Sequence, residues 1–190
     1  MRKTAFWAAV GVALIGVLGT ATFALAHGFQ KDLKAKDMTG YNEAPAVSSA
    51  ATGDFKAKID DKADKIDYTE SYSGLEGDVT QSHIHFGQRN VSGGIMVWLC
   101  QTPGTPAPAA VAATVPQCPG PRAGTVSGTL TPASIVGPAG QGIAAGEWNE
   151  LLAAIRTGNA YANVHSLKFL GGEIRAQVNG KGHGFGRDKD

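Results

Sequence analysis

The chain has 190 residues, with 17 lysines and arginines against 16 aspartates and glutamates, and a formal net charge of +1 at pH 7. This length suits about one domain once any targeting segment is removed. The near-neutral balance predicts no basic surface of the kind that nucleic-acid binding requires, so nucleic acid is excluded as an expected partner.

Residues 1–26 are predicted to be a secretory signal peptide. A short basic start containing Arg2 and Lys3 precedes a run without charge from Ala5 to Ala26, and the run ends in the small-x-small pattern Ala24-Leu25-Ala26. The alternative is a retained membrane anchor, because the run is long enough to span a bilayer. We expect a secreted or otherwise extracytoplasmic protein, in the periplasm or at the cell surface, and membrane association only if the segment is retained.

Residues 27–178 are predicted to form one all-β domain. Short runs of alternating apolar residues are separated by glycine-rich turn signals, as in β-sandwiches and barrels. The predicted strands are Asp32–Met38, Gly53–Ile59, Lys65–Tyr72, Gln81–Phe86, Gly94–Cys100, Gly124–Leu130, Ala160–Leu167 and Gly172–Val178.

One segment, Glu147–Thr157, is predicted to be a helix instead. Its apolar residues Trp148, Leu151, Leu152 and Ile155 fall at i, i+3, i+4 and i+7, which is one face of a helix. Gly158 follows where a left-handed cap is preferred. Such a stripe most often packs on the core, so we expect this helix to close one end of it.

The only two cysteines, Cys100 and Cys118, are predicted to form a disulfide, because an even pair in an exported chain favours one. The alternatives are free thiols or a metal pair, and the 17 residues between them argue against a compact metal motif. The segment 100–121 is therefore predicted to be an exposed, proline-rich insertion. Residues 179–190, which include His183, are glycine-rich and charged and predict a disordered tail.

Strand alternation predicts which side chains share a face. If Ile84, Val164 and Ile174 face the core, a polar set shares the opposite face. That set contains His83, His85, His165, Asn163, Glu173 and Arg175.

The three histidines of this set, His83, His85 and His165, are a candidate copper or zinc site. Alternate strand residues lie about 6.5–7 Å apart, so two side chains can lean onto one ion, and neutral imidazole suits both metals. The alternative is a sheet with one solvated face, on which the histidines only form hydrogen bonds. Arg175 would then pair with Glu173 or with Glu70, and such a cation opposes metal binding.

Several motifs together resemble the CHRD domain, a family named after chordin. They are "GLEGDVTQSHIHFGQRNVSGGIMVWL", "LLAAIRTGNAYANVHSLKFLGGEIRAQV" and the opening "YNEAPAVSSAATGDFKAKI". The resemblance implies an antiparallel β-sandwich of the immunoglobulin-like or Cu,Zn-superoxide-dismutase-like kind, with one short helix. It implies no reaction, and the 100–121 insertion departs from the plain family pattern.

Two functions are compatible with these features. The first is a non-enzymatic extracellular binding or structural module with a protein or glycan partner, since no nucleophile or acid–base pair of carboxylates stands out and no catalytic residue is predicted. The second is a copper- or zinc-binding protein, either with redox activity or with a passive metal-binding role. Its His-x-His strand resembles that of Cu,Zn superoxide dismutase, but the further histidine and the aspartate of that enzyme's bridged site have no clear counterpart.

Overall fold

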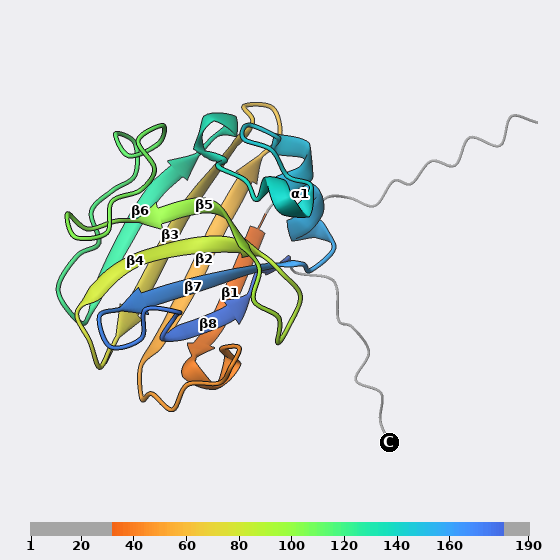
Figure 1. Ribbon diagram of the computed structural model, residues 1–190. Helices are drawn as coiled ribbons and strands as arrows, with labels where there is room; N and C mark the ends of the chain where they lie inside the picture. Colours follow the sequence, from red (N-terminus) through yellow and green to blue (C-terminus); the bar gives the residue numbers. More distant parts are fainter. Residues whose placement is uncertain (1–31, 181–190) are drawn as a thin grey trace, which may run out of the picture.

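The structure, a computed structural model, describes residues 32–180, which form an antiparallel β-sheet fold with one α-helix (Figure 1). The predicted signal peptide and the tail from residue 181 onward, with His183, lie outside the described residues. The strands are β1 (Asp32–Thr39), β2 (Thr52–Asp60), β3 (Lys65–Ser73), β4 (Val79–Phe86), β5 (Gly94–Cys100), β6 (Gly124–Leu130), β7 (Ala160–Ser166), β8 (Ile174–Gln177) and β9 (Asn179–Gly180).

All strands belong to one 9-stranded sheet with the order β5-β4-β7-β8-β1-β2-β3-β6, and β9 pairs with β1. The sheet bends into two layers, with β5, β4, β7 and β8 in front of β1, β2, β3 and β6 in Figure 1. The edge strands β5 and β6 come into contact, so the sheet nearly closes into a barrel. The all-β class is confirmed. The immunoglobulin-like or dismutase-like sandwich stays a prediction, because one continuous sheet joins both layers.

The eight predicted strands are all present, and their ends differ from the prediction by two residues at most. The predicted tail starts at Asn179, but Asn179 and Gly180 pair with Lys34 and Leu33 of β1. Ordered chain therefore continues for two residues past the predicted end of the domain.

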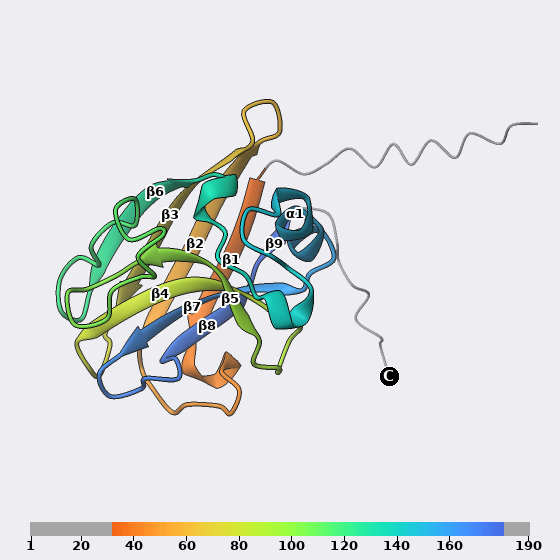
Figure 2. The same ribbon diagram turned by 45° about the horizontal axis from the view of Figure 1, so that its top comes forward.

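The core lies between the two layers and includes the three residues predicted to face it, Ile84, Val164 and Ile174. The helix α1 (Trp148–Arg156) contributes Trp148, Leu151, Leu152, Ala154 and Ile155 to the same core. It lies at the end of the sheet near β9 (Figure 2). Gly158 follows the helix with a φ of 74°, the left-handed conformation that glycine adopts without steric cost. The predicted helix and its cap are confirmed.

Cys100 and Cys118 form the predicted disulfide, which fits an oxidising compartment. The loop that the disulfide closes, which was predicted to be exposed, is buried in part. Ala107 and Val111 of this loop are buried against Trp98 of β5, and the three form a second, smaller hydrophobic cluster outside the main core. Among residues 32–180, no helix is long and apolar enough to cross a membrane.

Candidate metal centre

His83, His85 and His165 meet on the outer face of β4 and β7, opposite the core. The two strands are antiparallel neighbours, with His83 opposite Asn163 and His85 opposite Tyr161. His165 therefore lies diagonally across from His83 on the same face. One ring nitrogen from each histidine lies within 4.8 Å of the others, so the structure brings the three rings together.

The histidine face is buried, and the alternative of a solvated face is wrong. The exposed fractions of His83, His165 and His85 are 0 %, 5 % and 8 %. Trp98 of β5 lies edge-on against the His83 ring, with centroids 4.2 Å apart. The Tyr161 ring stacks parallel to that of His85 at 4.8 Å. Aromatic side chains and the neighbouring loops, not water, therefore surround the three rings.

Two backbone carbonyls orient two of the rings. Nδ1 of His165 donates to the carbonyl oxygen of Leu170 at 2.9 Å, and Nδ1 of His85 donates to that of Gly93 at 2.9 Å. A carbonyl oxygen only accepts hydrogen bonds, so each neutral ring carries its proton on Nδ1 and a lone pair on Nε2. Metal-binding histidines in proteins are commonly held in this way.

Gly93 occupies a position that no other residue can take. A Cβ there would lie 1.7 Å from the carbonyl oxygen of Phe86, which is far inside van der Waals contact. Tyr161 adds a second restraint, because its hydroxyl accepts a hydrogen bond from the Gly93 amide at 3.1 Å. The close approach of this loop to β4 and β7 thus sets the carbonyl that orients His85.

His83 completes the cluster with an unusual contact. Its Nδ1 lies 3.1 Å from Nε2 of His165, which is an acceptor, so Nδ1 of His83 is the donor. Within residues 32–180, neither Nε2 of His83 nor Nε2 of His85 has a hydrogen-bond partner, although both are buried. A buried polar atom without a partner costs free energy, about 1–3 kcal/mol, so these two atoms need an explanation.

Burial also keeps the three rings neutral. Desolvation lowers the pKa of His85 to about 4 and that of His83 well below its usual value, and the rings of His165 and His85 lower the pKa of His83 further. Desolvation likewise lowers the pKa of His165. Neutral imidazole is the form that binds a metal, so no proton has to leave at pH 7.

The other residues of the predicted polar set, Asn163, Glu173 and Arg175, are buried as well, and Glu173 and Arg175 have other partners than those predicted. Arg175 stacks on the Tyr161 ring, with Cζ 3.4 Å from the ring centroid, and donates to the carbonyl oxygen of Gln88. Glu173 accepts hydrogen bonds from the Ser49 hydroxyl and the Glu76 amide. The predicted pairing of Arg175 with Glu173 or Glu70 is therefore wrong.

Glu70 lies on the core side of β3, away from the histidines. Alternation places it with Tyr68 and Tyr72, and its Oε2 accepts a hydrogen bond from Ser82 at 2.5 Å. Burial raises its pKa to about 8.

Besides the Gly93 carbonyl, three contributors to this site were not recognised from the sequence. Glu43 accepts a hydrogen bond from the Asn163 amide at 2.5 Å, and burial raises its pKa to about 7. Trp98 covers His83, and the carbonyl of Leu170 orients His165. A signal for Trp98 exists, because β5 reads "GIMVWLC", a continuous apolar run typical of a strand buried on both faces. Backbone carbonyls leave no such signal.

Comparison with known proteins gives one match. A family model of the CHRD domain matches residues 35–178. No curated protein and no solved structure matches the chain. Since the match covers most of the chain, the chain belongs to the CHRD domain family, as its motifs indicated.

Proposed function

We propose that this CHRD-domain protein is an extracytoplasmic, non-enzymatic binding module whose ligand is a copper or zinc ion held by His83, His85 and His165. The carrying observation is that three neutral ring nitrogens converge within 4.8 Å in a buried place. Metal binding gives the predicted binding module a concrete ligand. It is also compatible with a dismutase-like sandwich and with export through the predicted signal peptide.

The unpartnered nitrogens support a metal more than a purely structural role. A structural cluster of buried polar groups is expected to satisfy each of them with a hydrogen bond. Here the carbonyls of Gly93 and Leu170 take the Nδ1 protons of His85 and His165, and Nε2 of His165 takes that of His83. The Nε2 lone pairs of His83 and His85 are left for another ligand. A metal ion accepts such lone pairs and removes the cost of leaving Nε2 of His85 without a partner.

Metal titration of the exported protein, purified without a histidine tag, tests this proposal. We expect one copper or zinc ion per chain with a Kd below about 1 μM, which is roughly −8 kcal/mol. The variant His83→Ala/His85→Ala should lose this binding, while His183→Ala, which changes a histidine that is not a proposed ligand, should keep it. Far-ultraviolet circular dichroism checks that both variants fold. Binding weaker than about 1 mM in the wild type, or equal binding by both variants, would exclude the site.

A further inference from the structure

From the charge and burial of the site we infer that it is built for monovalent copper, Cu(I), in preference to Cu(II) or Zn(II). This inference rests on the proposed function, because it concerns the same three histidines. It names the ion and its oxidation state, and it gives the module a role in holding reduced copper outside the cytoplasm.

The first argument is the charge of the ligands. The group of metal-binding side chains found within residues 32–180 contains His83, His85 and His165 and no carboxylate or thiolate. Neutral imidazoles leave the full charge of the ion in the site. The cost of burying a charge rises with its square, so a divalent ion costs about four times as much as a monovalent one at equal radius. A buried site without an anion therefore favours the smaller charge.

The second argument is the buried cation beside the site. Arg175 stacks on Tyr161, and the same Tyr161 ring stacks on His85. Arg175 forms no salt bridge with any described residue. Glu43 is the carboxyl whose charge acts on Arg175, but burial raises the pKa of Glu43 to about 7, so at neutral pH it offsets only part of that charge. Repulsion by Arg175 is twice as large for a divalent ion as for a monovalent one.

The third argument is coordination number. Structural zinc sites are almost always tetrahedral, and Cu(II) prefers a tetragonal arrangement, so each needs a further ligand besides three imidazoles. Trp98 is packed edge-on against His83, and Tyr161 lies flat against His85. Nε1 of Trp98 is the one polar atom that these two rings leave free, since the Tyr161 hydroxyl already accepts from Gly93, and a bound water usually has more partners than one. A three-coordinate ion is the better match, and Cu(I) accepts three imidazoles without a fourth ligand.

Competition titrations under anaerobic conditions test the inference. Cu(I), kept reduced with ascorbate, is titrated into the untagged exported protein against the chromophoric chelator bicinchoninate. Cu(II) and Zn(II) are titrated separately against chromophoric competitors of their own. We expect one Cu(I) per chain, bound at least about 1,000-fold more tightly than either divalent ion, and lost in His83→Ala/His85→Ala. Such a preference over Cu(II) raises the copper reduction potential by roughly 180 mV, at 59 mV per tenfold for one electron.

The outcomes separate this inference from the proposed function. If Zn(II) or Cu(II) binds the same histidines as tightly as Cu(I), the Cu(I) inference is overturned and the metal proposal stands. If no ion binds through these histidines, the proposed function itself fails, and the inference fails with it.

Two variants of Arg175 test the charge argument. Arg175→Gln removes the buried cation, so the preference for Cu(I) over Zn(II) should fall about tenfold or more. Arg175→Lys keeps the charge and should keep most of the preference. Because Arg175→Gln can lose the fold, Glu43→Gln is the second test, since removing the partial negative charge near Arg175 should widen the preference. An unchanged preference in every folded variant would overturn the charge argument.

Discussion

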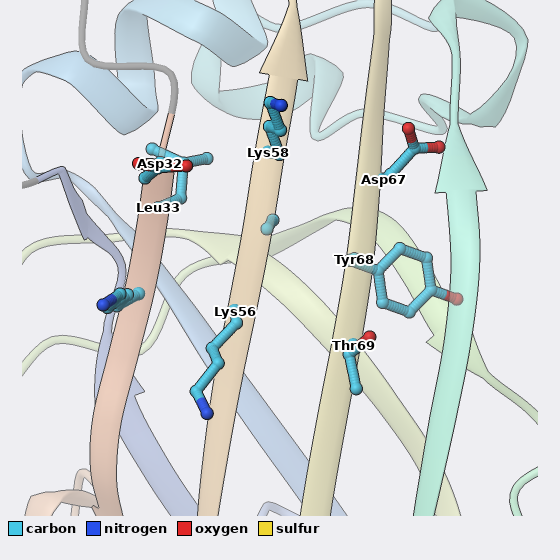
Figure 3. Close-up of a pocket in the computed structure, with 9 residues that line it drawn as sticks. Asp32, Leu33, Lys56, Lys58, Asp67, Tyr68 and Thr69 are labelled. Atoms are coloured by element: carbon cyan, nitrogen blue, oxygen red, sulfur yellow. The ribbon is translucent and has the colours of Figure 1, made fainter.

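The two layers of the sheet have similar alternating sequences but different outer faces. The outer face of β1, β2 and β3 is open to solvent, and Figure 3 shows Lys56, Lys58, Asp67 and Thr69 beside one another around a pocket on it. The outer face of β4 and β7 is covered, and every residue of β7 is buried. Polar side chains at alternate positions are thus ordinary surface residues in one layer and enclosed groups in the other.

This difference locates the candidate site. On the open layer, water satisfies charged side chains such as Lys58, so their presence needs no special reason. On the covered layer, each polar atom needs a protein partner or a ligand, because desolvation without compensation is costly. The buried atoms that lack partners beside the histidine cluster, Nε2 of His83 and of His85 and Nε1 of Trp98, are therefore more informative than the charged groups around the pocket of Figure 3.

The largest expected effect is on metal affinity, and it is seen by comparing one substitution on each layer. His85→Gln on the covered layer removes a ring ligand, so we expect metal affinity to fall about 1,000-fold, or roughly 4 kcal/mol. Lys58→Gln on the open layer changes one exposed charge and should change affinity less than about twofold. Isothermal titration calorimetry of both variants makes the comparison. Similar losses in the two would mean that metal binds on the open layer or nonspecifically.

Removing the disulfide should have the next largest effect, and it acts on the covered layer. Cys100→Ala/Cys118→Ala releases the loop whose residues Ala107 and Val111 pack on Trp98. For a loop of this size we expect the free energy of unfolding to fall by about 3 kcal/mol. Urea denaturation followed by Trp fluorescence measures it. A loss under about 1 kcal/mol would show that packing of the loop, and not the covalent bond, holds it in place.

The two faces of β3 give a pH-dependent test. Asp67 points outward, where hydrogen bonds from Thr129 and Lys65 lower its pKa. Glu70 points inward, where burial raises its pKa from 4.5 to about 8. Between pH 4.5 and about 8, Glu70 is ionised in the unfolded chain but keeps its proton in the folded chain. Its contribution to the free energy of unfolding is therefore full below pH 4.5 and is lost as the pH rises toward 8.

Glu70→Gln replaces the carboxyl by an amide that does not titrate, so the variant should not show this loss of stability with rising pH. Relative to the wild type, the variant should gain roughly 2–3 kcal/mol between pH 4.5 and 6.5, from about 1.4 kcal/mol per pH unit. The histidines titrate equally in both proteins, so the difference between the two denaturation curves isolates Glu70. A difference that does not change with pH would show that Glu70 is ionised in the folded protein.

Much of this comparison can be predicted from the sequence, because periodicity determines which side chains share a face. The alternation in "SHIHF" and "YANVHS" predicts that His83, His85 and His165 lie together, away from Ile84 and Val164. The same rule places Glu70 with Tyr68 and Tyr72 on the core side of β3. Glu70 therefore could have been excluded from the sequence as a partner of Arg175.

What periodicity does not predict is which face is covered. The carbonyls that orient the rings belong to Gly93 and Leu170, which lie 8 and 5 residues along the chain from the rings they orient. They act through the backbone, so no side chain marks them in the sequence. Their positions depend on the tertiary path of each loop. The uninterrupted apolar run of β5 was the one local indication that the outer face of this layer is buried.

The smallest expected effect lies wholly on the open layer and uses its cross-strand register. Lys34 of β1 lies directly opposite Lys56 of β2, whereas Lys58 lies opposite Asp32 on one side and Asp67 on the other. Like charges in directly opposite positions destabilise a sheet, and opposite charges stabilise it, each by about 0.2–1 kcal/mol. Lys56→Glu should therefore raise the free energy of unfolding by about 0.5 kcal/mol, and Lys58→Glu, with the same change of net charge, should lower it by a similar amount. Both effects should shrink in 1 M NaCl, where the Debye length is about 3 Å. Changes of the same sign in the two variants would mean that net charge, and not cross-strand pairing, controls the stability of this layer.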